Sequence, residues 1–509
     1  MFVIAAVVIT ALSLAVLADS MTKSIGRDEY MYCTAGVLTA RGKMIYRDFS
    51  YAAQLPYHPL LYAVLFKALD TNRYLLVGRL SSCVCDVFIL ICIVGISRLM
   101  FRPHEITGTL AGLAGAVLYV FNPLVDYANG YAWNHDVVIL CVMLSLWLFL
   151  SIDFQHKSRH WRIAVIGALL TFAACMRITT ALVELLFFVI ILNQPAASIK
   201  QRFRTALPFL AAAGVLLIWP VWIIAHAPQA FYLNLVKIPA LYGRWLREIG
   251  MVYDKLKLTT VSLTTPAYLV LFVLAAYLIV TIVYLRRKLE KPDTRKCQLV
   301  VMLPIVFFVI ALIPPTMWVQ YLAMPVPFLV VGLVFGLSLL RKLTHRANVN
   351  FHFKVASVLL TVCVFIVVLS NPVVLYRMPL VAASEIWTPN KLHEVSQDMV
   401  DVMGGPRLTL TLAPLFALEG GCDIYIELSC GAIIYRIADS LTTEEVQITH
   451  TVGMESLGLL LAARQPPGAI ITGMEMEQLE KPLVRVAGQD WLRKDYPDGP
   501  TLYYRNTRQ

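Results

Sequence analysis

Long apolar segments recur along the first three-quarters of the chain, and they constrain its fold more than any other feature. A helix needs about 20 mostly apolar residues to cross a bilayer. Candidate spans lie near residues 2–18, 75–97, 107–123, 136–152, 162–176, 178–193, 205–225, 264–285, 298–313, 321–340 and 355–372. This pattern predicts an α-helical polytopic membrane protein with about eleven transmembrane helices. The fifth and sixth spans are separated only by a short interruption around Arg177.

Composition supports the same class. Of the 509 residues, 59% are hydrophobic and 15% are charged, whereas soluble domains are about half apolar and a quarter charged. The net charge of +11 does not come from a basic domain, because the cations lie in short loops between apolar segments. We therefore expect membrane lipids, and no nucleic acid, as partners. The first segment lacks a basic leader and a small-residue cleavage site, so it is predicted to be retained as a helix.

Basic loops follow every second span, and positively charged loops are typical of the cytoplasmic side. They comprise Arg98 and Arg102, residues 156–162, residues 200–204, residues 286–296, and residues 341–354. This alternation predicts a cytoplasmic N-terminus. It places the first long loop (about 19–74), the loop at 226–263 and the whole tail on the outer side. That alternation holds only if two helices flank Arg177.

The tail differs in character from the membrane part. We expect a transmembrane domain over residues 1–380 and an extracytoplasmic α/β domain over residues 381–509. Predicted helices are Lys391–Met403, Thr442–Val446 and Met454–Arg464, and predicted strands are Leu408–Leu412, Ala469–Thr472 and Thr501–Tyr504. Cys422 and Cys430 are candidates for a disulfide if the tail lies in an oxidising compartment.

Two adjacent carboxylates, Asp28 and Glu29, lie in the first outer loop shortly after the first span. A short helix is predicted from Asp28 to Ala40, with Ser24 as its cap. In one interpretation the two acids only complement the helix dipole. In the other, one of them is a general base for an acceptor hydroxyl. The loop also carries polar and aromatic side chains of the kind that bind sugars, and the candidates are Asp48, Gln54, Tyr57 and His58.

These loop segments resemble a known family. Asp28-Glu29-Tyr30, Tyr46-Arg47-Asp48-Phe49 and Gln54-Leu55-Pro56-Tyr57-His58-Pro59 are similar to the first outer loop of GT-C glycosyltransferases. The closest similarity is to bacterial enzymes of glycosyltransferase family 39, related to protein O-mannosyltransferases. The resemblance is strongest over about the first 200 residues. It implies a GT-C type membrane domain in the bacterial cytoplasmic (inner) membrane and a sugar donor linked to polyprenyl phosphate.

The resemblance also implies particular site residues. The first-loop acidic residue of the family maps onto Asp28, with Glu29 beside it as a second catalytic candidate. A second acidic position matches Asp136, with Asp126 in reserve, although Asp136 could equally cap its own helix. Tyr321 lies in a segment where the family commonly has a cation or histidine before the tyrosine. This chain has Gln320 there, which puts phosphate contact by that position in doubt.

Four basic residues are candidates for the carrier phosphate: Arg177, Lys237, Arg244 and Arg247. Alternatively, Arg177 only reaches lipid headgroups at the membrane surface. A divalent cation held by Asp28, Glu29 and Asp136 is a further option, and no other cofactor is indicated. The chain has no P-loop, dinucleotide-binding glycine motif or DxD triplet, which fits a lipid-phosphate donor rather than a nucleotide sugar.

The sequence thus predicts an inverting transfer of sugar to an acceptor hydroxyl, with Asp28 as base. The acceptor is a glycolipid, a glycan or a protein. The alternative is a transporter or flippase for a lipid-linked substrate, with Arg177 and Glu184 as charges on its path. A structural anchor for the tail is a third option, for which about eleven helices are excessive.

Overall fold

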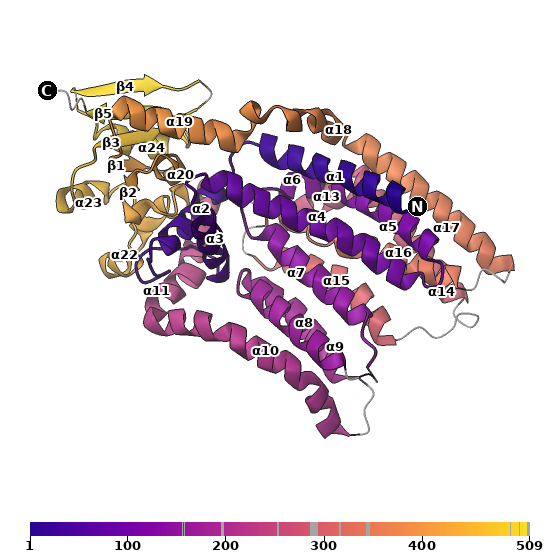
Figure 1. Ribbon diagram of the computed structural model, residues 1–509. Helices are drawn as coiled ribbons and strands as arrows, with labels where there is room; N and C mark the ends of the chain where they lie inside the picture. The colour runs from indigo at the N-terminus through magenta and orange to yellow at the C-terminus, as the bar shows by residue number, and fades with distance from the viewer. Residues whose placement is uncertain are drawn as a thin grey trace.

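The computed structural model describes residues 1–505 except 155, 157, 195–197, 252, 253, 286–293, 315, 316, 343–346, 489 and 498. Parts of the basic loops at 156–162, 286–296 and 341–354 therefore lie outside the described residues. A bundle of long helices forms the membrane part, and the tail caps one end of it (Figure 1).

Each predicted span coincides with a helix. These helices are α1 (Phe2–Thr22), α4 (Tyr74–Met100), α5 (Glu105–Val120), α7 (His135–Leu150), α8 (Arg159–Ala174), α9 (Ala181–Leu192), α10 (Ile199–His226), α14 (Pro266–Leu285), α15 (Thr294–Leu312), α16 (Val326–Arg341) and α17 (Ala347–Ser370). Seven helices of the described part are long and apolar enough to cross a membrane. The chain is a multi-pass membrane protein, and eleven crossings remain a prediction.

The break at Arg177 is confirmed. Helix α8 ends at Ala174, and Arg177 takes an extended backbone conformation with φ −142° and ψ 104°. A 3₁₀ turn, η1 (Ile178–Thr180), then leads into α9. The apolar stretch is thus two helices rather than one, and the junction places the Arg177 side chain at a helix end.

Shorter helices lie between the long ones, at the end of the bundle that the tail covers. They are α2 (Arg27–Ala40), α3 (Tyr57–Ala68), α6 (Pro123–Ala128), α11 (Pro228–Tyr232), the π-helical η2 (Leu233–Lys237), α12 (Ile238–Glu248) and α13 (Lys255–Leu263). Helix α2 confirms the predicted short helix, but its cap is Gly26 and not Ser24. The Glu29 carboxylate accepts a hydrogen bond from the Gly26 amide at 2.7 Å, which satisfies a free donor of the first turn.

The tail begins after α18 (Val373–Arg377), η4 (Met378–Ala382) and η5 (Ser384–Ile386), and α18 and η4 run beside α1. It contains a five-stranded sheet of order β2-β1-β3-β5-β4, in which β1 is parallel to both neighbours and β5 is antiparallel to both of its own. The strands are β1 (Leu408–Thr411), β2 (Asp423–Ile424), β3 (Ala469–Thr472), β4 (Trp491–Asp495) and β5 (Thr501–Arg505). The three predicted strands are confirmed, whereas β2 and β4 were not predicted.

The helices of the tail are α19 (Thr388–Met403), α20 (Pro414–Glu419), α21 (Ala432–Tyr435), α22 (Thr443–Thr449), α23 (Leu457–Ala463) and α24 (Glu477–Val484), with short turns η6 (Ile426–Leu428) and η7 (Ala438–Ser440). Three of them match the predicted helices. The proposed disulfide is wrong, because Cys422 and Cys430 both carry free thiols. Each thiol is buried, and the Cys430 Sγ donates to the Ser50 carbonyl at 3.1 Å.

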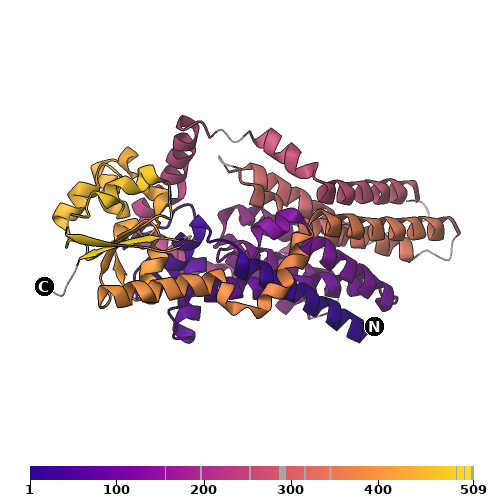
Figure 2. The ribbon, with the colours of Figure 1, turned by 90° about the horizontal axis from the view of Figure 1, so that it is seen from above.

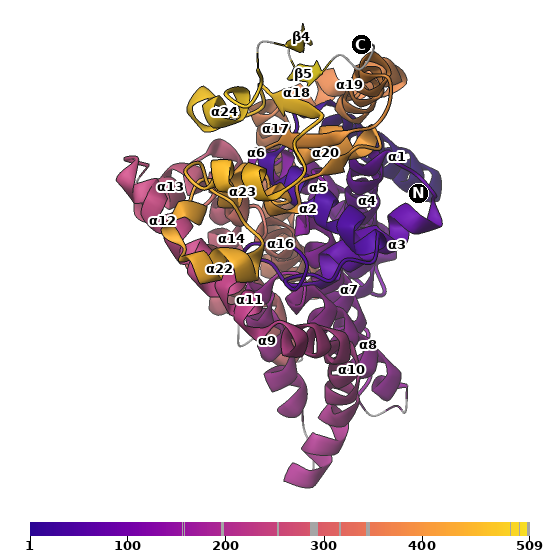
Figure 3. The ribbon, with the colours of Figure 1, turned by 90° about the vertical axis from the view of Figure 1, so that its left-hand side faces the viewer.

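The tail and the first outer loop share one hydrophobic core, in which Tyr30 and Tyr62 of the loop helices lie with Phe416 and Leu502 of the tail. Helix α2 contacts α20, and α22 contacts α11 and η2 (Figures 2 and 3). The buried Glu419 carboxylate accepts from the Leu75 amide at 2.8 Å, at the start of α4. The division into two domains near residue 380 therefore stays a prediction, and the outer loop is the surface on which the tail is seated.

Candidate functional site

Asp28 occupies the first turn of α2 and is partly buried. Its carboxylate makes no hydrogen bond or ion pair with any residue that the structure describes. Burial raises the pKa of Asp28 to about 6, and the charge of Glu29 acts in the same direction. The positive charges of Arg27 and Arg177 oppose that rise. A free carboxylate with a pKa near neutrality has the properties of a general base.

Glu29 differs from Asp28 in both its burial and its partners. Its side chain is fully buried and paired with Arg79, which is also fully buried. The Arg79 Nε donates to Oε1 at 2.9 Å and Nη2 donates to Oε2 at 2.8 Å. The amides of Gly26 and Ala132 donate to the same carboxylate, each at 2.7 Å. Of the roles left open for Glu29, the structure thus favours the positioning of the loop over proton transfer.

Arg79 also holds the end of α1. Its remaining donors bind the carbonyl oxygens of Ser20, Lys23 and Ser24 at 2.7, 2.8 and 2.9 Å. All five N–H groups of the guanidinium are therefore used. This arrangement joins α1, α2 and α4 at Glu29, the residue next to Asp28, so the position of Asp28 depends on a buried ion pair that is itself satisfied.

Arg177 lies close enough to Asp28 for its charge to act on the carboxylate. Its guanidinium carbon lies 4.6 Å from the centre of the Tyr321 ring, a cation–π contact that orients the side chain. Burial raises the pKa of both Asp28 and Tyr32, and the charge of Arg177 opposes that rise at each residue. The structure thus brings together three residues predicted for the site: Asp28, Arg177 and Tyr321. An aromatic ring leaves the N–H donors of Arg177 available for an anion.

The tail contributes to this region through Glu475, whose side chain is 2% exposed. One carboxylate oxygen pairs with Arg27 at 3.0 Å, and the other pairs with Arg436 at 2.6 Å. Arg436 in turn donates to the Tyr242 hydroxyl of α12 at 3.4 Å. The residue next to Asp28 is thus fixed by the tail, and α12 is tied to the same point.

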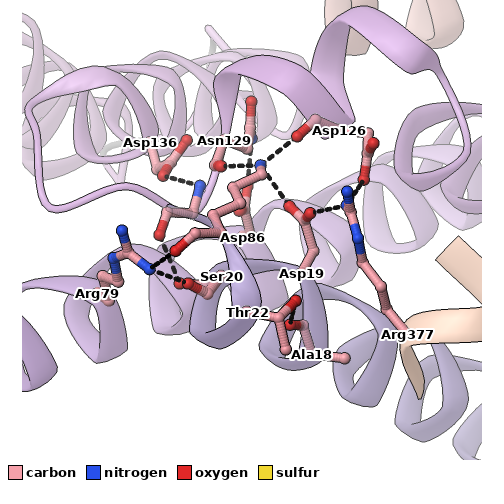
Figure 4. A network of polar contacts seen from close by, with 12 residues as sticks. Ala18, Asp19, Ser20, Thr22, Arg79, Asp86, Asp126, Asn129, Asp136 and Arg377 are labelled. Carbon is pink, nitrogen blue, oxygen red and sulfur yellow. Dashed lines mark hydrogen bonds and ion pairs between the residues drawn. The ribbon is translucent and has the colours of Figure 1, made fainter. Parts of the chain in front are cut away.

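Asp136 and Asp126, the candidates for a second acidic position, lie in a polar network at the C-terminal end of α1, which Arg79 connects to Glu29 through the Ser20 and Lys23 carbonyls (Figure 4). Asp136 is fully buried and accepts from the Gly130 amide at 3.0 Å. Asp126 pairs with Arg377 of α18 at 3.2 Å. Both residues therefore have structural partners, and neither contacts Asp28.

The centre of this network is Lys23, which is paired with Asp19 at 2.5 Å and donates to the Asn129 carbonyl at 2.7 Å. Deeper in the bundle, the Asn129 amide and the Tyr119 hydroxyl donate to Asp86 at 2.6 and 2.9 Å. A cavity of about 20 Å³ lies among these side chains. The network joins α1, α4, the α6–α7 connection and α18.

The proposed cation ligands are not brought together. Glu29 is saturated by Arg79 and two amides, and Asp136 belongs to the network of Figure 4. In the described part of the chain, no group of three or more histidine, cysteine or acidic side chains has the geometry of a metal site. Asp28, Glu29 and Asp136 thus do not fit a shared divalent cation.

The other predicted sugar contacts hold the outer loop together. The Asp48 carboxylate accepts from the Met44 amide at 2.7 Å and pairs with Arg47. Gln54 accepts from the Asn134 amide at 2.9 Å. Asp48 thus closes a turn and Gln54 joins the loop to the start of α7, and their role as sugar contacts stays a prediction.

Tyr57 and His58 lie in aromatic packing. The Tyr57 hydroxyl donates to the Leu216 carbonyl of α10 at 2.5 Å. His58 is fully buried, and its ring centre lies 4.8 Å from Tyr32 and 4.2 Å from Tyr62. Burial lowers the pKa of His58 to about 3. The role of Tyr57 and His58 as sugar contacts stays a prediction.

The three basic residues of the 226–263 loop differ in their partners. Lys237 forms an ion pair with Glu445 of α22, so it joins the loop to the tail. Arg244 and Arg247 lie on exposed positions of α12. The structure does not place them against Asp28, and their role as phosphate ligands stays a prediction.

Sequence reasoning missed Arg79, Asp86 and Glu475. Arg79 and Asp86 had a usable signal, because ionisable residues within a predicted span are rare and are usually paired. Glu475 had none, since it lies in the tail more than 400 positions from Arg27 and only the fold makes them neighbours.

Comparison with solved structures identifies the fold of this chain. No family model and no curated protein sequence matches the chain. Solved structures do. ArnT from Cupriavidus metallidurans bound to undecaprenyl phosphate superposes with a TM-score of 0.61 at 13% identity, covering 98% of this chain and 97% of that one. The apo state of the same protein gives a TM-score of 0.60 at 13% identity, covering 97% of this chain and 96% of that one.

The oligosaccharyltransferase of Archaeoglobus fulgidus, in a complex with Zn and sulfate, gives a TM-score of 0.51 at 11% identity, covering 97% of this chain and 73% of that one. Both neighbours have the GT-C fold, and the superposition extends through the membrane part and the tail of this chain. The chain therefore has the GT-C glycosyltransferase fold.

Proposed function

We propose that this protein is a membrane glycosyltransferase that moves a sugar from a polyprenyl-phosphate carrier to an acceptor hydroxyl. The observation that carries the proposal is the state of Asp28, an unpaired outer-loop carboxylate with a pKa raised to about 6. It lies beside Arg177, whose donors are free for an anion, in a fold similar to that of a structure with bound undecaprenyl phosphate.

In the proposed reaction, Asp28 accepts the proton of the acceptor hydroxyl as its oxygen attacks the anomeric carbon. The bond between that carbon and the phosphate oxygen breaks, and its electron pair leaves with the polyprenyl phosphate. Attack opposite to the leaving group inverts the configuration. Arg177 stabilises the charge on the departing phosphate, and the Tyr321 ring holds the guanidinium in place. Glu29 and Arg79 keep Asp28 in position.

The remaining assignments are parts of the same proposal. The site faces the outer side of the cytoplasmic membrane, the N-terminus is cytoplasmic, and the tail is periplasmic or extracellular. The acceptor is a glycolipid, a glycan or a protein. The tail borders the site through Glu475 and Arg27, which supports a role for it in acceptor selection.

The test uses purified full-length protein in detergent with labelled polyprenyl-phosphate sugars and a panel of acceptors. We expect transfer by the wild-type protein and a loss of transfer by the Asp28→Asn variant. Asp70→Asn is the matched control, because Asp70 is an exposed acid of the same loop with positive φ, which asparagine tolerates. Transfer that survives Asp28→Asn would contradict the catalytic assignment.

The transporter alternative has less support. The carboxylate of Glu184 accepts a hydrogen bond from the Thr171 hydroxyl of the neighbouring helix at 2.5 Å, which gives it a local structural role. Reconstituted vesicles separate the two functions. Movement of a labelled polyprenyl-phosphate sugar across the bilayer without glycosyl transfer would favour the transporter.

A further inference from the structure

A large pocket lies at the end of the helix bundle opposite the tail. It opens between α1, α4, α7 and α8 and has a volume of about 510 Å³. Three arginines line it, one from each of three segments: Arg98 at the end of α4, Arg102 after α4, and Arg162 in α8. Helix α2, which carries Asp28, lies at the opposite end of α4 (Figure 1), so this pocket is separate from the candidate site.

The charges in the pocket do not balance. Its one carboxylate, Glu105, pairs with Arg98 at 2.8 Å. Arg102 makes no hydrogen bond or ion pair with any residue in the described part of the chain. Arg162 binds the Ser151 carbonyl, but its Nε is buried and has no hydrogen-bond partner there. Two guanidinium charges thus lack an anion, and a buried N–H donor lacks an acceptor.

The walls of the pocket are apolar. Ile9 of α1, Ile91 and Leu99 of α4, and Trp147 of α7 line it. The indole of Trp147 lies against Gly95, where a Cβ atom would come within 2.4 Å of the ring. Glycine at this position therefore lets the ring approach α4 closely. The pocket thus combines basic side chains at one end with an apolar wall. Ile91 of that wall is 39% exposed on the outside of the bundle.

We propose that this pocket binds an anionic glycerophospholipid, with the headgroup phosphate on Arg102 and Arg162 and an acyl chain along the apolar wall. Guanidinium groups bind phosphate oxygens through paired, charge-assisted hydrogen bonds. Basic pockets between transmembrane helices at a membrane surface suit anionic headgroups. A soluble anion would satisfy the arginines but would leave the apolar wall uncovered. The inference does not depend on the proposed glycosyl transfer.

The test is thermal stability of the full-length protein in a neutral detergent, titrated with phosphatidylglycerol, phosphatidylcholine, inorganic phosphate or polyprenyl phosphate. We expect phosphatidylglycerol to raise the melting temperature at the lowest concentration. Arg102→Gln removes no intramolecular bond, so it should fold and weaken the apparent affinity about tenfold, as expected for one lost charge-assisted contact. The double variant Arg102→Gln/Arg162→Gln should abolish the effect.

Arg202→Gln/Arg204→Gln is the matched control, because it removes two charges from α10, outside the pocket, and it should respond like the wild type. Equal stabilisation by phosphatidylcholine would overturn the proposal, as would an unchanged response in the Arg102→Gln variant. An equal rise in melting temperature with inorganic phosphate would show that the pocket binds an anion without a lipid chain. Stronger stabilisation by polyprenyl phosphate would assign the pocket to the carrier instead, and either result would overturn the lipid assignment.

Discussion

Asp28 and the aspartates of the polar network lie at the same end of the bundle, and they differ in their partners. In the network of Figure 4, Asp19 and Asp126 pair with basic side chains, and Asp136 accepts a hydrogen bond from a backbone amide. At the start of α2, Asp28 has no such partner among the residues that the structure describes. A paired buried carboxylate stabilises the fold and is occupied by its partner, whereas an unpaired one is free to exchange a proton. The residue type does not explain the difference, since all four residues are aspartates at the same end of the bundle, and it lies in their partners.

The largest expected effect comes from removing the unpaired carboxylate. Asp28→Asn should lower the rate of glycosyl transfer by about 10²–10⁴-fold, the usual contribution of a general base. The melting temperature should not fall, because Asp28 holds no other group in place. The measurement is initial transfer rate together with thermal unfolding. A rate close to that of Asp70→Asn would place the base elsewhere.

The second largest effect is expected from removing the buried ion pair between Arg79 and Glu29. Arg79→Met should destabilise the protein by about 3–5 kcal/mol, because it leaves the buried Glu29 without its charge partner. Chemical denaturation or thermal unfolding measures this change. Arg47→Met removes the exposed Arg47–Asp48 pair and should cost less than about 1 kcal/mol. Similar losses for the two variants would refute the assignment of Arg79 as the anchor of the loop.

A smaller effect is expected in the network. Arg377→Gln breaks the contacts of α18 with Asp19 and Asp126. It should destabilise the protein by about 1–3 kcal/mol, since partly exposed charged hydrogen bonds are lost. The transfer rate per folded molecule should stay close to the wild-type value. If transfer were lost in a folded Arg377→Gln protein, the network would belong to the active site and the comparison would fail.

The subtlest effect is on pH dependence. A base must be ionised to accept a proton, so transfer should rise as the pH increases through about 6, the raised pKa of Asp28. The same raised pKa means that the folded state holds its proton more tightly than the unfolded chain. Stability should therefore fall as the pH rises from about 4 to 6, and Asp28→Asn should remove that fall.

Arg27→Gln refines this prediction. The Arg27 charge lowers the pKa of Asp28, so its removal should move the acid limb of the rate profile to higher pH. The pH profile of the initial rate provides the measurement, with Arg47→Gln as control. An unmoved limb would indicate that another group titrates.

Much of the fold could be predicted because it depends on local properties. Apolar length alone located every long helix, and the interruption at Arg177 divided α8 from α9. The strands β2 and β4 were missed because one has only two residues and the other is polar and exposed. Asp28 could be singled out by its place after the first span and by its resemblance to a family motif. Its difference from Glu29 could not, since adjacent acids look alike in a sequence.

The sequence by itself determined that this chain crosses a membrane many times and carries two acids in its first long loop. Only the tertiary structure decided which acid is free. Arg79 reaches Glu29 from α4, and Glu475 reaches Arg27 from the tail. Burial by apolar residues follows from composition along a segment, whereas the pairing of charges depends on which distant side chains meet. Because Arg79 pairs with Glu29 and Glu475 pairs with Arg27, Asp28 is left unpaired in the candidate site, among the residues that the structure describes.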